Sequence, residues 1–146
     1  MTSAAFWAAG SLLQLGDGAG SESFTSVAEI TKLSPPNRSR DEIEVTHTTS
    51  SDGYREFIPG WRDGGEVPFE ANWLPTNTTQ DETTGILESF NDNVTHNWRI
   101  VVPNASLYFP FTGFVTTYEP DLDIEKQGTL SGTIKITGKP GAPVAT

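Results

Sequence analysis

The chain has 146 residues, the size of one domain, and a domain of this size buries roughly two-thirds of the surface of its unfolded form. It contains no cysteine, which excludes disulfide scaffolds, zinc ribbons, iron–sulfur sites and thiol nucleophiles. Its 9 Lys and Arg against 19 Asp and Glu give a net charge of −10, which argues against tight binding of nucleic acid or of an anionic membrane but still allows DNA to pass nearby.

Residues 1–25 predict an N-terminal arm and a first strand. The opening is apolar, but the first basic residue is Lys32, so we expect neither a signal peptide nor a membrane helix. A Gly-rich turn over residues 16–25 precedes a predicted strand over residues 27–33. Pro35 and Pro36 terminate this strand, because proline cannot donate a hydrogen bond to a sheet.

Two segments alternate between apolar and polar residues, which is typical of half-buried strands. In residues 42–46, Ile43 and Val45 share one face. In residues 66–73, the apolar face consists of Val67, Phe69, Ala71 and Trp73. Further strands are predicted over residues 97–102, 107–118 and 129–137.

A long connecting segment, residues 47–64, separates the two alternating strands. It exceeds the roughly 2 to 5 residues usual in a hairpin loop, and long loops are usually functional. It also carries Tyr54, Phe57, Ile58 and Trp61. One interpretation is an Ω-loop that packs on its own domain. The other is a loop that docks on another subunit, because Tyr, Trp and Arg dominate interface energetics.

One helix is predicted, over residues 80–91 within the segment 79–92. Thr79 would cap its free N–H groups, and Ile86, Leu87 and Phe90 would form its apolar stripe. Residues 138–146, with Pro140 and Pro143, predict a flexible, extended C-terminal tail.

About seven short strands and one flanking helix predict a mostly β fold, an antiparallel β-sandwich or barrel with a long inter-strand loop. We expect one domain over residues 1–146 without internal repeats.

No catalytic, cofactor or metal site is predicted. His47 and His96 lack neighbours at metal-binding spacing, and residues 121–125 lack the Gly and the terminal Glu of a calcium loop. The four Trp leave a sugar-binding sandwich open as an alternative, although Trp73 and Trp98 lie on the apolar faces of strands. A hydrolase that uses paired carboxylates is a further alternative, because acids are numerous.

Residues 40–46, 51–67 and 128–140 together resemble the major tail tube proteins of long, non-contractile-tailed (siphovirus, lambda-like) bacteriophages. The resemblance extends from Gly10 to about Pro140. Its most specific part runs from Arg40 to Thr46 and from Ser51 to Val67.

This resemblance implies a structural subunit of the phage tail tube, which is not an enzyme. Such subunits form hexameric rings whose inner strands join into one barrel, and the rings stack into a hollow tube through which genomic DNA passes into the host. The resemblance also implies a place in the virion tail, assembly in the host cytoplasm, and a tape measure protein, a tail terminator and a distal tail protein as partners. A tail terminator or a secretion tube protein would share much of this fold.

The resemblance further assigns roles to residues of this sequence. The ring-stacking element would be residues 50–63, with Tyr54, Arg55, Glu56, Phe57, Ile58, Trp61, Arg62 and Asp63 in contact with the next ring. The candidates for the lumen wall are Glu42, Glu44, Glu66, Glu70 and Asn72.

Overall fold

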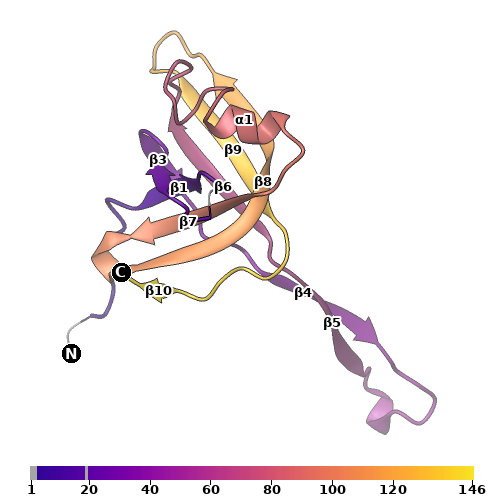
Figure 1. The fold of residues 1–146 in the computed structure, drawn as a ribbon. Helices are drawn as coiled ribbons and strands as arrows, with labels where there is room; N and C mark the ends of the chain where they lie inside the picture. The colour runs from indigo at the N-terminus through magenta and orange to yellow at the C-terminus, as the bar shows by residue number, and fades with distance from the viewer. Residues whose placement is uncertain (1–2, 19) are drawn as a thin grey trace.

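A computed structural model describes residues 3–18 and 20–146, and Figure 1 shows its fold. The strands are β1 (Leu12–Gly16), β2 (Phe24–Ser26), β3 (Ile30–Leu33), β4 (Ser39–Glu44), β5 (Phe57–Asp63), β6 (Glu66–Asn72), β7 (His96–Val102), β8 (Leu107–Asp121), β9 (Thr129–Ile136) and β10 (Val144–Ala145). The helix α1 spans Ile86–Asn91, and short 3-10 turns lie at Ser51–Gly53 and Pro103–Ala105.

Eight strands form one antiparallel sheet in the order β2-β1-β7-β8-β9-β6-β3, with β10 added beside β8. The long strand β8 bends the sheet into two layers. It pairs with β7 up to Gly113 and with β9 from Gly113 onward, and its register shifts between Val115 and Thr117. The half with β1 and β7 therefore crosses over the half with β9 and β6 (Figure 1). The prediction of a mostly β, antiparallel sandwich is confirmed.

The core fills the space between the two layers. The alternation correctly predicts Val67 and Phe69 of β6 as buried. Trp98 is fully buried as well, and its indole N–H donates to the carbonyl of Gly113 at 3.2 Å. The buried apolar residues are Leu13, Val27, Val67, Phe69, Ala71, Ile86, Trp98, Ile100, Val102, Phe111, Val115, Leu130, Ile134 and Ile136.

The helix is shorter than the sequence predicts. It begins at Ile86 rather than at residue 80, with Gly85 as its N-cap, and residues 75–84 form turns. Thr79 does not cap it; its hydroxyl oxygen accepts from the backbone N–H of Ala28 at 3.0 Å. The helix packs against β8, where buried Ile86 reaches the core.

The contacts of Gln80 explain why turns are found where the sequence predicts the first part of the helix. Its side chain is fully buried and satisfies three backbone groups. Its carbonyl oxygen accepts from the N–H of Leu74 at 2.9 Å. Its amide group donates to the carbonyls of Ala28 at 3.1 Å and Asn72 at 3.0 Å. A regular helix from residue 80 would not place one side chain on all three groups.

We expect Gln80→Ala to destabilise the fold by about 2–3 kcal/mol, because it leaves backbone groups without partners in a poorly solvated place. Urea unfolding measures the change, with Gln14→Ala as a control that removes two half-buried side-chain hydrogen bonds, with Ser26 and Arg99, but leaves no backbone group without its partner. A loss below about 0.5 kcal/mol, the range of ordinary surface substitutions, would contradict this role.

The C-terminal segment differs from its prediction as a mobile tail. The N–H of Gly141 donates to the carbonyl of Pro110 at 2.9 Å, and that of Thr146 donates to Ser106 at 3.0 Å. Strand β10 pairs Val144 with Tyr108 of β8. The segment covers the edge of β8 that β9 leaves open, so it satisfies backbone groups that the topology would otherwise expose.

Candidate assembly surfaces

A two-stranded hairpin, β4 with β5, extends away from the sandwich (Figure 1). These strands pair with each other and belong to a sheet separate from the large one. Residues 57–63, which the sequence predicts as part of a loop over residues 47–64, are strand β5. Isolated two-stranded hairpins are at best marginally stable in water. The hairpin is therefore a structure that an additional partner would stabilise.

Apolar side chains cover the hairpin and remain exposed. Trp61 is 86% exposed and Tyr54 75%, while Phe57 and Ile58 are each 48% exposed. The interpretation of the segment as an Ω-loop packed on its own domain is therefore wrong. An apolar surface of this kind marks an interaction site more often than a free surface.

The same hairpin corrects the prediction for the strand over residues 42–46. Ile43 is 46% exposed and Val45 39%, although their alternation predicts a half-buried face. Ile43 lies directly opposite Ile58 across the hairpin. The apolar face exists, as the alternation indicates, but no second layer of this chain lies behind it.

Polar contacts within the hairpin shape its tip. The Oγ of Ser50 donates to a carboxylate oxygen of Glu56, and the N–H of Glu56 donates to the hydroxyl of Thr46 at 2.9 Å. His47 Nε2 lies 3.2 Å from Glu56 Oε2. Asp52 adopts a φ of 56° and Gly53 a φ of 75°, which reverses the chain direction. The tip therefore has a defined shape without support from the sandwich.

The root of the hairpin is fixed to the sandwich by Asp63. Its Oδ1 accepts from Lys135 Nζ at 2.8 Å and from the N–H of Gly65 at 2.7 Å. Gly65 has a φ of 84°, and a Cβ there would lie 2.2 Å from the carbonyl oxygen of Asn37. Only glycine fits this turn, because both the φ and the close approach exclude a side chain.

The hydrogen bond from Lys135, followed by that from Gly65, lowers the pKa of Asp63 below its usual value of 3.8. A lowered folded-state pKa means that Asp63 stabilises the fold at pH values above its unfolded-state pKa, and that this contribution disappears as the pH falls through the folded-state value.

We expect a carboxyl titration followed by NMR to give a pKa for Asp63 below 3.8, and Lys135→Met to move it back up toward that value. The stability difference between wild type and Asp63→Asn should be constant at neutral pH and vanish in acid. An Asp63 pKa that does not respond to Lys135→Met would contradict the ion pair.

The second candidate surface is the side of β3, β6, β8 and β9 that faces away from the core, which we call the outer face. Side chains directly opposite across strands share this face. One row joins Glu119 of β8, Ser131 of β9, Glu70 of β6 and Lys32 of β3. Other outer-face residues are Ser34, Glu66, Pro68, Asn72, Phe114, Thr116, Thr117, Asp121, Thr129, Thr133 and Lys135. The face is rich in carboxylates and hydroxyl groups.

The structure divides the five candidates for the lumen wall. Glu66 and Glu70 are exposed on the outer face. Asn72 lies at the end of β6, where it is half-buried and its amide donates to Glu29 at 3.2 Å. Glu42 and Glu44 lie on β4 of the hairpin, so they do not share a surface with the other three. Sequence alternation missed Glu119, whose position opposite Ser131 depends on the bulge in β8.

The stacking candidates, in contrast, lie together. All eight belong to the hairpin, between Tyr54 near the tip and Asp63 at the root. Phe57, Ile58, Trp61 and Arg62 are on β5, and all four are at least partly open to solvent.

The described residues, 3–18 and 20–146, contain no group of three or more His, Asp or Glu side chains arranged to hold a metal ion. His96 Nε2 does lie 2.8 Å from Asp92 Oδ2, a pair that the sequence did not predict. Within the same residues, no helix has the length and apolar character that crossing a bilayer requires.

Comparison with known proteins adds a family and a fold. The family described as "Lambda phage tail tube protein, TTP" matches residues 11–144. No curated protein sequence matches the chain.

Among solved structures, the chain is similar to one from the tail of an empty GTA particle with C6 symmetry, with 18% identity, a TM-score of 0.69, and coverage of 92% of this chain and 94% of that one. It is similar to a chain of the native gene transfer agent virion, with 16% identity, a TM-score of 0.68, and coverage of 93% and 95%. It is also similar to a chain from the PVC sheath/tube terminator of an extracellular contractile injection system, with 14% identity, a TM-score of 0.68, and coverage of 100% and 99%.

Proposed function

The chain belongs to the lambda phage tail tube protein family and is a structural tail tube subunit, and we propose that six copies close into a ring and that rings stack into the tube. The observation that carries this proposal is the hairpin of β4 and β5, whose apolar side chains have no covering layer in the described chain. The resemblance in fold to a chain from a tail with C6 symmetry supports the number six.

The sheet edges support closure into a ring. β2 and β3 are the two ends of the strand order, so in the part of the chain that is described each has one edge without a partner strand. Exposed edges are templates for pairing with another chain. A ring gives these edges neighbours, and it would turn the outer faces of six copies toward one lumen.

The hairpin supports stacking. A contact between two different surfaces, the hairpin of one copy and the body of another, does not close on itself and produces an open filament. We propose that Tyr54, Phe57, Ile58 and Trp61 supply the apolar part of this contact. We also propose that the hairpin stiffens on docking.

The lumen would be lined by the outer face, with Glu66, Glu70 and Glu119 toward the passing DNA. The carboxylates of this face repel phosphates, and of its two cations, Lys32 and Lys135, the second is paired with Asp63, so we expect DNA to move with little adhesion. Screening confines this repulsion to about 8 Å from the wall at physiological salt. In this proposal the subunit has no catalytic role, assembles in the host cytoplasm, becomes part of the virion tail, and meets a tape measure protein, a tail terminator and a distal tail protein.

Negative-stain electron microscopy of the concentrated, purified protein tests the proposal. We expect rings or hollow filaments. Compact single particles at every concentration would contradict it.

A tail terminator is the second candidate, because the fold is also similar to a chain from a sheath/tube terminator. A terminator caps a tube and does not polymerise. Rings that never lengthen into filaments would therefore favour the terminator.

A further inference from the structure

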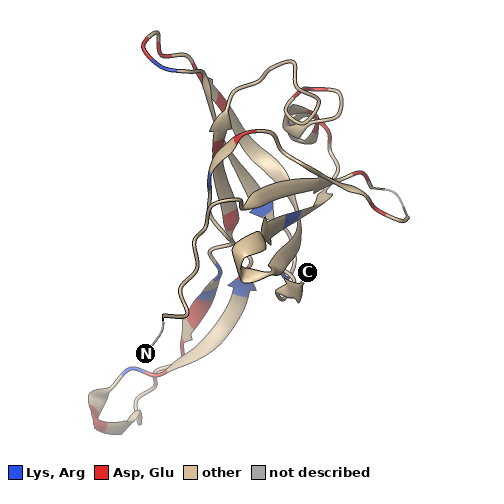
Figure 2. Ribbon diagram, turned by 90° about the vertical axis from the view of Figure 1, so that its left-hand side faces the viewer, with Lys and Arg blue, Asp and Glu red and all other residues tan. Residues whose placement is uncertain are grey.

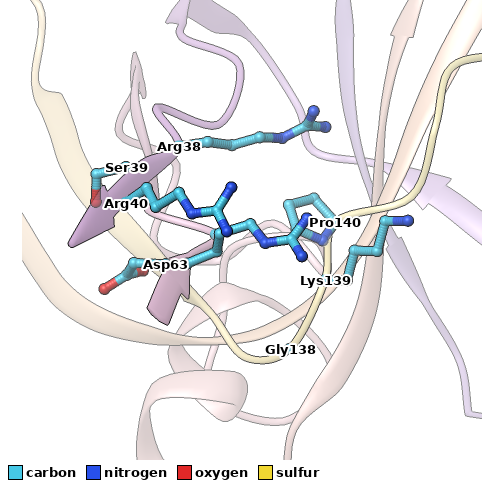
Figure 3. A pocket seen from close by; sticks show the side chains of 9 residues that line it. Arg38, Ser39, Arg40, Asp63, Gly138, Lys139 and Pro140 are labelled. Carbon is cyan, nitrogen blue, oxygen red and sulfur yellow. The ribbon is translucent and has the colours of Figure 1, made fainter. Parts of the chain in front are cut away.

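A cleft at the root of the hairpin gathers four cations. It is lined by Arg38, Arg40, Arg62 and Lys139 together with Ser39, Asp63, Gly64, Gly138 and Pro140. We call it the basic cleft. The side chains of Arg38, Arg40 and Lys139 extend toward the same open side (Figure 3). The chain has 9 Lys and Arg in total, so almost half of its cations meet at one place in a strongly acidic protein.

The subunit itself does not neutralise this cluster. Arg40 and Arg62 are direct partners across the hairpin, an arrangement in which like charges repel. The carboxylate of Asp63 points away from the arginines (Figure 3) and bonds Lys135. Within residues 3–18 and 20–146, none of the four cations of the cleft forms an ion pair. The repulsion therefore calls for an acidic group from outside the subunit.

An acidic loop lies at the other end of the molecule. It consists of Asp121, the last residue of β8, and the connection to β9 over residues 122–128, and we call it the acidic loop. It carries Asp121, Asp123 and Glu125, none of which forms an ion pair within the described residues, and a single cation, Lys126. Two apolar side chains also project from the loop: Leu122 is 73% exposed and Ile124 fully exposed.

The fold places these two charged features at opposite ends. β9 begins at Thr129, directly after the acidic loop, and ends at Ile136, two residues before Gly138 of the basic cleft. Figure 1 and Figure 2 both show the loop at one end of the body and the hairpin at the other. In Figure 2, the loop is marked mainly by red segments, and blue segments gather at the hairpin root, although the hairpin also carries red segments.

We propose that the basic cleft of one subunit receives the acidic loop of a subunit in the adjacent ring, so that stacking is specified by ion pairs as well as by apolar contact. This inference rests on the proposed function. Head-to-tail stacking brings opposite ends of two copies together, and here one end carries the basic cleft, the other carries the acidic loop, and each has exposed apolar residues. Complementary charge speeds encounter and rejects the wrong partner.

Charge reversal tests the proposal in four variants. The cleft variant carries Arg40→Glu and Arg62→Glu, and the loop variant carries Asp121→Lys and Glu125→Lys. The third variant combines all four changes. The matched control, Glu82→Lys with Glu88→Lys, changes the net charge as the loop variant does but lies outside both surfaces.

We expect the cleft variant and the loop variant each to raise the protein concentration needed for filaments by at least about tenfold, because like charges then meet. The combined variant restores filaments, as does a mixture of the separately purified cleft and loop variants. The control polymerises like wild type. Circular dichroism verifies that each variant is folded. If the combined variant is unfolded, the mixture of the separately purified cleft and loop variants tests the charge pairing in its place.

Two results would overturn the charge pairing: filaments from the cleft or loop variant at the wild-type concentration, or no recovery in the mixture of two folded variants. Either result leaves the tube itself intact, because wild type still polymerises. Absence of filaments from wild type would instead overturn the proposed function and, with it, this contact.

Discussion

Simultaneous replacement of Trp61 and Phe57 by alanine should give a folded subunit that no longer polymerises. Both side chains lie on β5, where Trp61 is 86% and Phe57 48% exposed, so we expect their loss to cost the free subunit only about 1 kcal/mol and to leave it folded. In the tube, burial of each such side chain is worth about 1.5–3 kcal/mol. The concentration required for filaments should therefore rise roughly a hundredfold or more.

Phe90→Ala is the matched control. Phe90 is 43% exposed on α1, close to the 48% of Phe57, but it lies outside the hairpin. We expect this variant to polymerise like wild type in sedimentation and electron microscopy. If the double variant is unfolded at ordinary temperature, the hairpin supports its own domain and the assignment to stacking fails.

Replacement of Glu66 and Glu70 by lysine should leave tubes intact and slow the release of DNA through them. Both carboxylates are exposed on the outer face of β6, while Val67 and Phe69 on the opposite face hold the core. Each new lysine can neutralise a phosphate and so create adhesion where the wall had repelled DNA. The retardation should weaken at high salt, because counterion release drives such binding.

Glu42→Lys with Glu44→Lys is the informative comparison for the lumen. These residues lie on β4 of the hairpin, away from the outer face, so the same change of charge should not retard DNA. Release from triggered particles, followed by a DNA-binding dye, measures both variants. Wild-type release from particles with Glu66→Lys and Glu70→Lys would remove the outer face from the lumen.

Alternation in the sequence predicts the core strands well, but it does not predict what covers each face of a strand. The pattern reports which residues share a face, and for β6 and β9 that face meets the other layer of the sandwich. Ile43 and Val45 follow the same pattern, but their face meets solvent in the single subunit. A period of two residues carries no information about what covers a face.

Long-range contacts explain most other differences. The helix of residues 80–91 has suitable residue types, but Gln80 bonds Ala28, far away in the sequence, and this tertiary contact overrides local propensity. The sequence did not predict strand β5, because proline and glycine are rare inside sheets. Pro59 and Gly60 are tolerated here because the hairpin has open edges.

The sequence located the hairpin candidates but not the basic cleft. The hairpin residues are neighbours in the chain, so a local concentration of aromatic residues was visible. Lys139 joins Arg38, Arg40 and Arg62 only because the strands after β5 return the chain to the root of the hairpin. The sequence offered one signal of the basic cleft, which is that basic residues are scarce. A group of basic residues such as Arg38 and Arg40 is easier to notice when the chain has few of them.

The separation of the acidic loop from the basic cleft gives the subunit two unlike poles. A subunit that approaches the tube in the inverted orientation would bring carboxylates against carboxylates, or guanidinium groups against guanidinium groups. The repulsion between like charges would prevent it from binding. Growth would thus have a built-in direction. However long the cylinder becomes, one mouth would keep a ring of unpaired acidic loops and the other a ring of unpaired basic clefts, which gives proteins that start or finish it a chemical means to tell the two mouths apart.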